Sequence, residues 1–306
     1  MKILVTGGAG FIGSHVTKQL LDQGHKVVVY DNLSCGFKKL IDPRATFVLG
    51  SISEKEKLSE ALSGVEAVIH MAAFIIVPES VEKPDLYWEN NVVGTGVLLE
   101  AMKAAGTKKI IFSSSATVYG EPDKLPLTEE SPVKKAENPY GQTKIEMEKL
   151  IEKEHEDNGL NAVILRYFNP YGPNELHNPE THAIPNFILA TLNKEPIPLY
   201  WNGEQVRDFI YVEDLAASHI ATLGLEGLNI FNVGTGSGTK VKDIVNKIFD
   251  IVGYEVPIKD LGERAGDVNA NYTAADKIKK ELGWSAKVSL EEGLKKTVEF
   301  FKNLNN

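Results

Sequence analysis

The stretch Lys2–Ser14, KILVTGGAGFIGS, decides the fold of this chain. It opens with a short β-branched run typical of a buried strand, and Gly7, Gly10 and Gly13 follow at intervals of three. From Phe11 onward, apolar residues recur near helical spacing. A strand, a glycine turn and a helix start bring free backbone N–H groups and the positive end of a helix dipole together. The stretch therefore predicts a phosphate-binding turn of the dinucleotide type.

A carboxylate follows where such a site needs one. The next apolar run, VVVYD, ends at Asp31. A carboxylate there can accept hydrogen bonds from both ribose hydroxyls of an adenosine, and it would repel a 2′-phosphate. The glycines alone could mark only a tight strand–helix turn. With Asp31 in place they predict a dinucleotide site that favours NAD over NADP.

Composition limits the function classes. The length of 306 residues allows one large or two modest domains. The formal net charge of −9 disfavours a nucleic acid or an anionic membrane as partner, because both need a basic face. Arginine is scarce, so each one is a candidate anion clamp: Arg44, Arg166, Arg207 and Arg264.

Cys35 is the only cysteine, which excludes an intrachain disulfide and fits a reducing compartment. No run approaches the roughly 20 apolar residues of a membrane span, and no signal peptide is legible before Gly7. We therefore expect a cytoplasmic protein. No His, Cys and carboxylate cluster has metal-ligand spacing, so no metal site is expected.

Strand and helix patterns alternate through the first half, with helices expected near 54–62, 85–105 and 139–157. This order predicts an α/β protein with a Rossmann-like, doubly wound parallel sheet and helices on both faces. Ligands of such sheets bind beyond the carboxyl ends of the strands. Four of these ends carry small or polar residues: Gly7, Asp31, Ala72-Ala73 and Ser113-Ser114-Ser115.

The pattern changes after residue 168. Pro and Gly in the segment 169–186 argue against any regular element, and PLYW (198–201) and RDFIYV (207–212) are each expected to form one strand. We place an NAD-binding domain at 1–168 and a smaller, mixed α/β substrate domain at 169–306, with some later segments returning to the first sheet. GTGSGTK (234–240) is interpreted as a structural turn, because Thr239 stands where a phosphate loop needs Gly.

Tyr140 and Lys144 are four apart, so they share one face of a predicted helix. A lysine ammonium beside a phenol lowers the pKa of the phenol from about 10, and a positively charged nicotinamide would lower it further. Tyr140 could then act as a base near neutral pH, with Ser115 holding a substrate oxygen. The alternative is a surface helix beside a serine-rich loop. His70 is interpreted as a packed strand-end histidine.

Seven motifs occur in the order seen in extended short-chain dehydrogenase/reductases: TGGAGFIG, Asp31, SSSATVYG, YGQTK, RYFN, RDFIYV and ERAGD. Nearly end to end, the chain most resembles the UDP-glucose (UDP-galactose) 4-epimerases. The resemblance implies an NAD-dependent isomerase that inverts C4 of a UDP-hexose through a transient 4-keto sugar. It implies that Tyr140 is the base, that Lys144 lowers its pKa and bonds the nicotinamide ribose, and that Ser115 bonds the 4-oxygen, with Thr117 as a neighbour.

The resemblance also implies binding residues. The expected NAD contacts are Gly7, Gly10, Phe11, Ile12, Gly13, Asp31, Asn32, Ser34, Ser51, Ile52, Ala72, Ala73, Asn90, Tyr140, Lys144 and Phe168. The expected UDP-sugar contacts are Ser115, Tyr140, Asn169, His182, Ala183, the backbone of Leu199, Tyr200 and Trp201, and Arg207, Arg264 and Asp267. A homodimer through the helices near 85–105 and 139–157 is implied, with candidate apolar contacts Leu86, Val93, Val97, Met147, Leu150 and Ile151, all of which could equally be core.

The chain departs from the family pattern in three places. Ser51 replaces an aspartate of many relatives, which shifts adenine binding toward the backbone at Ile52. The loop 169–182 is shorter than in typical galactose epimerases. Asn271 stands where some relatives have a Tyr that closes the sugar pocket, so an N-acetylated sugar could enter.

Several alternative functions compete with simple epimerisation. The related dehydratases and decarboxylases need a carboxylate where this chain has Ala116 and Thr117, which favours simple epimerisation. A UDP-glucuronate 4-epimerase and a non-catalytic NAD-binding sensor remain alternatives.

Overall fold

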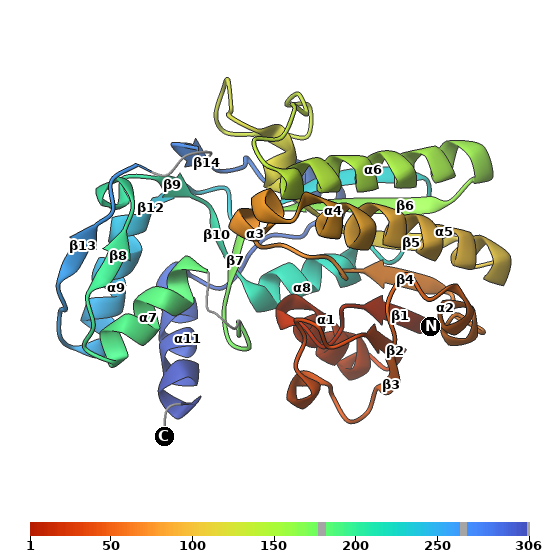
Figure 1. Cartoon of the computed structure of the whole chain (residues 1–306), viewed down its shortest axis with the longest axis horizontal. Helices are drawn as coiled ribbons and strands as arrows, with labels where there is room; N and C mark the ends of the chain where they lie inside the picture. Colours follow the sequence, from red (N-terminus) through yellow and green to blue (C-terminus); the bar gives the residue numbers. More distant parts are fainter. Residues whose placement is uncertain (177–181, 264–267, 305–306) are drawn as a thin grey trace.

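The larger part of the molecule is built on a seven-stranded sheet (Figure 1). The computed structural model describes residues 1–176, 182–263 and 268–304. The strand order is β11-β6-β5-β4-β1-β2-β3, and all six pairings are parallel. The strands are β1 (Lys2–Thr6), β2 (Lys26–Asp31), β3 (Thr46–Leu49), β4 (Ala67–His70), β5 (Lys109–Ser115), β6 (Asn161–Tyr167) and β11 (Leu228–Val233). The predicted doubly wound α/β fold is confirmed.

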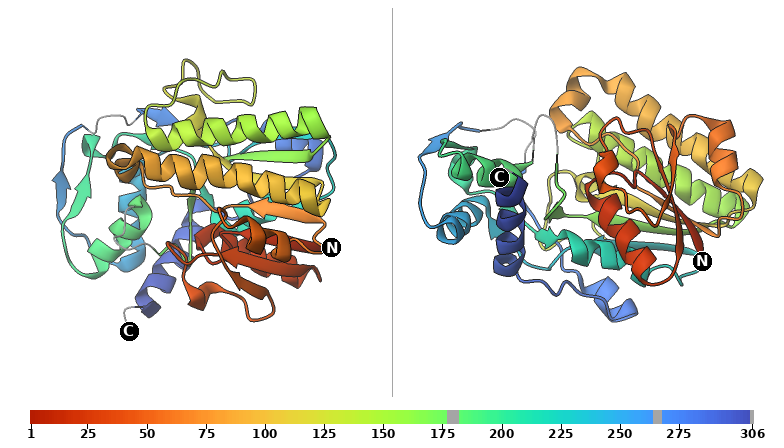
Figure 2. Two further views of the ribbon diagram at one scale, coloured as in Figure 1. Left: turned by 45° about the vertical axis from the view of Figure 1, so that its right-hand side comes forward. Right: turned by 90° about the horizontal axis from the view of Figure 1, so that it is seen from below.

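Helices cover both faces of this sheet (Figures 1 and 2). Along β1, Ile3 and Val5 enter the core under one layer and Leu4 enters the core under the other, as the two-residue period of a strand requires. Both cores are apolar, which explains the near-continuous hydrophobic runs of the strands. One layer consists of α1 (Phe11–Asp22) and α8 (Val212–Ala221), and the other of α2 (Lys55–Ala61), α5 (Gly94–Ala105) and α6 (Pro139–Asn158).

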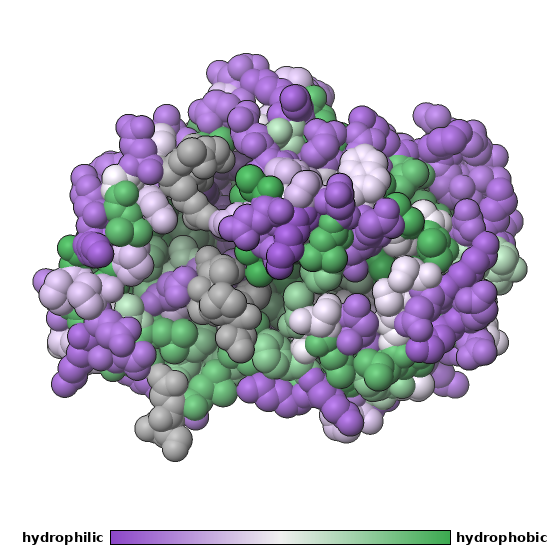
Figure 3. All heavy atoms as spheres, in the orientation of Figure 1, coloured by the Kyte–Doolittle hydropathy of each residue, from purple (hydrophilic) through white to green (hydrophobic). Residues whose placement is uncertain are grey.

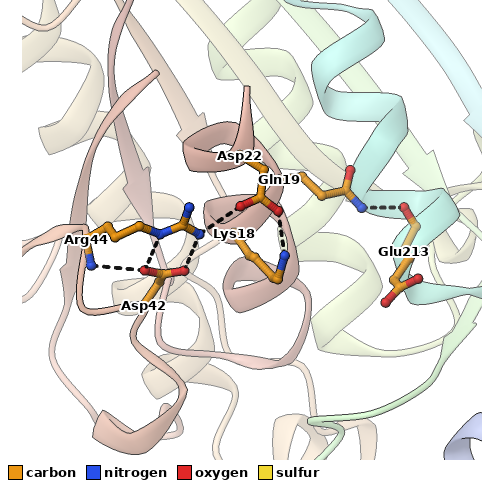
Figure 4. Close-up of polar contacts among 6 residues, drawn as sticks. All are labelled: Lys18, Gln19, Asp22, Asp42, Arg44 and Glu213. Atoms are coloured by element: carbon orange, nitrogen blue, oxygen red, sulfur yellow. Dashed lines mark hydrogen bonds and ion pairs between the residues drawn. The ribbon is translucent and has the colours of Figure 1, made fainter. Parts of the chain in front are cut away.

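A polar cluster ties α1 to its surroundings (Figure 4). Arg44 contacts the carboxylates of Asp42 and Asp22, and the Gln19 amide donates to the backbone oxygen of Glu213 at the start of α8 at 2.9 Å. The Arg44 side chain is 49 % exposed, so these ion pairs contribute little stability. The cluster does not border the cleft described below, and Arg44 is therefore no anion clamp there.

The smaller part has its own core, formed by three helices and the strands beside them (Figure 1). The helices are α7 (Ala183–Leu192), α9 (Val241–Val252) and α11 (Leu290–Leu304). The strands form the pair β13 (Ile258–Asp260)–β8 (Ile197–Leu199) and the trio β12 (Thr239–Lys240)–β9 (Val206–Arg207)–β14 (Ala270–Asn271). The chain also returns to the first sheet after residue 169: β11 pairs with β6, and α10 (Asp276–Leu282) packs on β11.

The expected helix 85–105 is interrupted. It consists of α4 (Pro84–Tyr87), a π-helical turn η2 (Trp88–Val93) and α5, and it is preceded by α3 (Val77–Glu82). Asn91 in the π turn donates to Phe74 O at 3.0 Å and to Thr143 Oγ1 at 3.0 Å, which ties the turn to α6 and to the loop after β4. Such π turns occur often at functional sites, and Asn90 of this one borders the cleft.

Three expectations about local structure are wrong. Asn169–Tyr171 forms strand β7, which pairs with β10 (Phe209–Tyr211) despite its proline. RDFIYV is broken at Asp208, because the Asp208 carboxylate accepts hydrogen bonds from the backbone N–H groups of Thr235 (2.8 Å) and Gly236 (3.1 Å). In PLYW the strand β8 ends at Leu199 and the extended backbone ends at Tyr200, because Trp201 and Asn202 have φ values of 53° and 49° and start the short turn η4 (Trp201–Gly203).

The helices expected to form the dimer interface also bury several of the candidate interface residues. Met147 and Ile151 are fully buried in the core between α6 and the sheet, and Leu150 and Val97 pack against that core. Met147 and Ile151 therefore belong to the interior of one chain, whereas Leu150 and Val97 are only partly buried. Two short 3-10 turns complete the elements, η1 (Lys38–Leu40) and η3 (Ala116–Tyr119). In the described part of the chain, no helix is both long and apolar enough to cross a membrane.

Candidate active site

A cleft of about 820 Å³ lies at the carboxyl ends of the sheet strands, between the two parts of the molecule. Figure 3 shows a hollow in this region with hydrophobic side chains at its border. The glycine turn after β1, Asp31 at the end of β2, Ala72 and Ala73 after β4 and Ser115 at the end of β5 all line it. The predicted convergence of four strand ends is confirmed.

The glycine turn has the geometry that a phosphate needs. Gly7 has a φ of +71°, and its N–H donates to Tyr30 O at 2.9 Å. A Cβ on Gly13 would lie 2.2 Å from Gly7 O, so only glycine lets α1 pack this close to the turn. A Cβ on Gly10 would meet only Gly7 O, at 3.2 Å, which leaves its other side open. Helix α1 begins at the next residue, Phe11, with its free N–H groups at the cleft.

Asp31 is held rigidly at the end of β2. Its Oδ2 accepts from Ala9 N at 3.0 Å and its Oδ1 from Leu33 N at 2.7 Å. Burial raises the pKa of Asp31, and these two backbone bonds oppose the rise. Each carboxylate oxygen keeps further acceptor capacity, and the side chain lines the cleft. The turn, the helix start and this carboxylate fit an adenosine dinucleotide without a 2′-phosphate.

The capping of α6 places Tyr140 in its first turn. Pro139 is the first helical residue, and the Asn138 side chain accepts a hydrogen bond from Gly141 N at 2.9 Å. Tyr140 is 9 % exposed. Burial raises the pKa of its phenol to about 12, and a hydrogen bond with Ser115 opposes the rise. The Tyr140 phenol and the Ser115 hydroxyl therefore meet at the edge of the sheet.

Lys144 lies one turn further along α6. Its Nζ donates to Ser113 O at 2.7 Å and lies 5.0 Å from the centre of the Phe112 ring. Burial lowers the pKa of Lys144 to about 7, and the Glu148 carboxylate opposes this. The ammonium is 6.0 Å from the centre of the Tyr140 ring, and burial dominates the pKa of Tyr140. The expected lowering of the Tyr140 pKa by Lys144 is thus not seen among the side chains of this structure.

Residues of the smaller part form the opposite wall of the cleft. Arg207 donates to Val206 O at 2.9 Å and to Val268 O at 2.8 Å, and it lines the cleft. His182 Nδ1 lies 2.7 Å from the carboxylate of buried Glu175. Arg166 does not line the cleft, because Glu148 binds it inside the larger part. Arg264 and Asp267 lie outside the described residues.

Most of the expected binding residues border this one cleft. Ser51 and Trp201 do not line it. The Ser51 hydroxyl pairs with that of Ser53 at 2.9 Å, whereas Gly50 and Ile52 border the cleft. The expected residues that do line it are Gly7, Gly10, Phe11, Ile12, Gly13, Asp31, Asn32, Ser34, Ile52, Ala72, Ala73, Asn90, Ser115, Tyr140, Lys144, Phe168, Asn169, His182, Ala183, Leu199, Tyr200 and Arg207.

Other lining residues were missed. The segment 74–79 after β4 borders the cleft, held by Tyr87, whose hydroxyl donates to Ile76 O at 2.8 Å. Glu175 and Gln205 also line it. No spacing in the sequence marks segment 74–79. Gln205, by contrast, lies two residues before Arg207, so the strand that carries Arg207 could have indicated it.

His70 is confirmed as a packed histidine. It is fully buried, with its Nδ1 2.8 Å from Thr6 Oγ1 and its Nε2 2.9 Å from Thr95 Oγ1. Burial and the nearby Lys144 ammonium lower the pKa of His70 to about 3, so the ring is neutral at physiological pH.

The parallel sheet, the glycine turn and the Tyr140–Lys144 helix together define a dinucleotide-dependent enzyme of the extended short-chain dehydrogenase/reductase class. Residues 3–234 match the NAD dependent epimerase/dehydratase family. The chain belongs to this family. It is 40 % identical to a UDP-glucose 4-epimerase of Bacillus subtilis, over 95 % of this chain and 94 % of that protein.

Solved structures agree over the whole chain. A UDP-glucose 4-epimerase of Thermotoga maritima, crystallised with UDP-glucose, superposes with a TM-score of 0.95 at 38 % identity and covers 100 % of both chains. The Thermus thermophilus UDP-glucose 4-epimerase in complex with NAD superposes with a TM-score of 0.93 at 33 % identity and covers 99 % of both chains.

Proposed function

We propose that this chain is an NAD-dependent UDP-hexose 4-epimerase that interconverts UDP-glucose and UDP-galactose. The observation that carries the proposal is the meeting of Tyr140, Ser115 and Lys144 at the same cleft edge as the glycine turn and Asp31. A base, a hydroxyl partner and a dinucleotide site are what reversible oxidation of a carbinol requires. When bound, NAD supplies reversible hydride transfer at C4 of the sugar.

The chain supplies proton transfer and orientation. Tyr140 takes the proton of the 4-hydroxyl, and Ser115 donates a hydrogen bond to the same oxygen. Because burial raises the pKa of Tyr140 to about 12, positive charge must lower that pKa for the phenol to act near neutral pH. The Lys144 ammonium does not lower it in this structure by itself, so the charge of the oxidised nicotinamide would have to act together with Lys144 when NAD is bound. Arg207, and Arg264 as an expectation, bind the diphosphate by charge-assisted hydrogen bonds.

Inversion needs no further acid or base. Ala116 and Thr117 follow Ser115 at the position where elimination or decarboxylation requires a carboxylate, and Ala116 is buried. Thr117 N donates to Ser115 Oγ at 3.3 Å, which orients the Ser115 hydroxyl. This arrangement favours 4-epimerisation over 4,6-dehydration. UDP-glucuronate, and TDP-sugars in place of UDP-sugars, remain substrates to be tested.

N-acetylated sugars form a second substrate class. Asn271 is half-buried on β14, paired in register with Arg207, but it does not line the cleft. Asn271 would therefore widen the sugar pocket only indirectly, by changing the position of Arg207. Comparing turnover of UDP-GlcNAc with that of UDP-glucose tests this class, and absence of N-acetyl turnover removes it.

The experiment for the main proposal is a panel of UDP- and TDP-sugars with the product configuration read by NMR. Tyr140→Phe should lose about 10²- to 10⁴-fold in turnover, as expected for a general base, while the protein keeps its NAD. Tyr254→Phe is the matched control, because the Tyr254 hydroxyl donates to Thr191 O and neither residue lines the cleft. A non-catalytic NAD sensor would show no turnover in the wild type and no change in NAD binding on Tyr140→Phe.

We further propose a cytoplasmic homodimer formed through the outer face of α4, η2 and α5. Leu86, Trp88 and Val93 are 43 %, 44 % and 41 % exposed there. Val93→Glu should convert a dimer to a monomer in light scattering. Val133→Glu is the control, since Val133 is 43 % exposed on a loop. A wild-type monomer would contradict the proposal.

A further inference from the structure

A charged cluster is buried between α6 and the sheet. Glu148 and Arg166 are 3 % and 4 % exposed. The guanidinium donates from Nε to Glu148 Oε1 at 3.0 Å and from Nη2 to Oε2 at 2.7 Å. The Ser114 hydroxyl also donates to Glu148 Oε1. One carboxylate thus links α6 to the carboxyl ends of both β5 and β6.

The cluster continues across the sheet. Arg166 Nη1 donates to the Tyr119 hydroxyl at 3.0 Å, and that hydroxyl donates to Asn232 Oδ1 at 2.7 Å. Tyr119 ends the η3 turn that starts directly after Ser115, and Asn232 lies on β11. The same hydrogen-bonded network therefore reaches the segment that carries Ser115.

The cluster is in register with the site. Tyr140, Lys144 and Glu148 are four residues apart on one face of α6. The three residues at the end of β5 meet them in turn: the Ser115 side chain lies beside the Tyr140 phenol, Ser113 O accepts from Lys144, and the Ser114 hydroxyl donates to Glu148. Two successive turns of the helix are thus hydrogen-bonded to the strand end, and the turn before them brings Tyr140 to Ser115.

The Glu148–Arg166 pair fixes the orientation of α6 more than it adds to the stability of the fold. A buried ion pair is often no more stabilising than apolar residues of the same volume. A bidentate carboxylate–guanidinium pair, however, permits one relative orientation of the elements it joins. A shift of α6 by one residue would turn Tyr140 by about 100° away from Ser115.

We propose that Glu148 is a positioning residue of this enzyme, which through Arg166 and Ser114 holds α6 in the register that brings the Tyr140 phenol to Ser115. This proposal rests on the proposed function only because one of its tests measures epimerase activity. Glu148, Arg166 and Tyr119 lie outside the cleft lining, whereas Ser114 borders the cleft with the site residues that the cluster positions.

The charge of Glu148 also acts on Lys144. It opposes the burial that lowers the Lys144 pKa. Other ionisable side chains around this face are Tyr140 and Glu152 on α6, His70 on β4, Tyr119 on η3, and Arg166 and Tyr167 on β6. In Glu148→Gln the Arg166 cation is left without its counter-charge, so the pKa of Lys144 falls further. The alkaline limb of the pH–kcat profile, where Lys144 loses its proton, should move to lower pH.

The test compares Glu148→Gln with Glu146→Gln. Glu146 lies on the same helix, nearer to Lys144 in sequence, and pairs with Lys149 on the surface at 2.9 Å. Glu148→Gln should lower kcat at least ten-fold with KM within two-fold, keep its NAD and shift the alkaline limb. Glu146→Gln should match the wild type. A folded, NAD-loaded Glu148→Gln protein with the wild-type kcat and pH profile would overturn the proposal.

Two further measurements cover the remaining outcomes. If Glu148→Gln does not fold, Ser114→Ala removes only one hydroxyl of the cluster and should lower kcat three- to ten-fold. In that case wild-type kcat in Ser114→Ala would overturn the proposal. Hydrogen exchange of the 140–144 backbone amides needs no turnover. It should be faster in Glu148→Gln than in Glu146→Gln even if the wild type epimerises nothing, and equal rates would count against the positioning role.

Discussion

Three glycine-to-alanine changes separate folding from cofactor binding in this enzyme. In Gly13→Ala the new Cβ would lie 2.2 Å from Gly7 O and 2.8 Å from the Gly8 Cα. Both neighbours are backbone atoms of the turn, so the start of α1 must move by roughly 1 Å to restore a normal contact. Overpacking of this kind costs about 3 kcal/mol, so we expect the Tm to fall by roughly 5 °C and NAD binding to weaken.

Gly10→Ala tests binding alone. The backbone at Gly10 is extended, with a φ of −86°, so alanine fits without strain. Its Cβ meets only Gly7 O at 3.2 Å, and its other side borders the cleft. We expect a Tm within about 2 °C of the wild type in the absence of added NAD. Loss of one charge-assisted hydrogen bond to the pyrophosphate should weaken NAD binding about 10- to 100-fold.

Gly96→Ala is the control. Gly96 is inside helix α5 and a Cβ there meets nothing within 4 Å, so alanine should leave NAD binding unchanged and stabilise the fold by about 0.5–1 kcal/mol. The assays are thermal unfolding by circular dichroism and NAD titration by fluorescence. A wild-type Tm for Gly13→Ala, or wild-type NAD affinity for Gly10→Ala, would refute the reasoning.

Three further predictions follow from charges in the structure. Asp31→Ser should weaken NAD binding about ten-fold and strengthen NADP binding, because the carboxylate that we propose bonds the ribose and repels a 2′-phosphate is gone; titration with both dinucleotides checks this, and an unchanged ratio counts against the role of Asp31. The pKa of Lys144 is lowered to about 7 in the folded protein, so the unfolded state binds more protons between pH 7 and about 10.5 and the free energy of unfolding rises with pH over that window, by up to about 5 kcal/mol. Lys144→Met should lack this rise in denaturant titrations at several pH values, and equal slopes would contradict it. Burial lowers the pKa of His70 to about 3, so the unfolded state takes up a proton near pH 6.5 that the folded state does not, and stability falls as the pH drops below about 6.5. His70→Gln should flatten that acid slope of Tm against pH, and a slope like that of the wild type would exclude His70 as its source.

The sequence predicted the parts of the site that depend on short-range patterns. A β-branched run, three glycines and an acid at the next strand end identify a dinucleotide turn within 31 residues, because local backbone geometry dictates those residue types. The strand ends with Gly7, Asp31, Ala72 and Ser115 could be placed together because parallel strands meet at one edge. Spacing alone also brought Tyr140 and Lys144 to one helix face.

Local patterns failed where a distant side chain decided the backbone. Asp208 breaks an otherwise strand-like run because it caps a turn at Thr235, which lies 27 residues away. Asn91 ties the π turn to Phe74 and Thr143, contacts that no helical period reveals. Met147 and Ile151 look like any apolar helix face in the sequence, and only packing against the sheet shows that they are interior.

What this chain determines by its sequence is therefore the identity of its phosphate turn, its acidic ribose partner and its tyrosine–lysine helix, because each is a matter of neighbouring residues. What only the tertiary structure decided is the state of those groups. We expected Lys144 to lower the pKa of Tyr140, but burial raises the pKa of Tyr140 and lowers that of Lys144. The Glu148–Arg166 pair fixes the position of helix α6. Desolvation and long-range pairing depend on everything packed around a group, and that is settled only when the whole chain has folded.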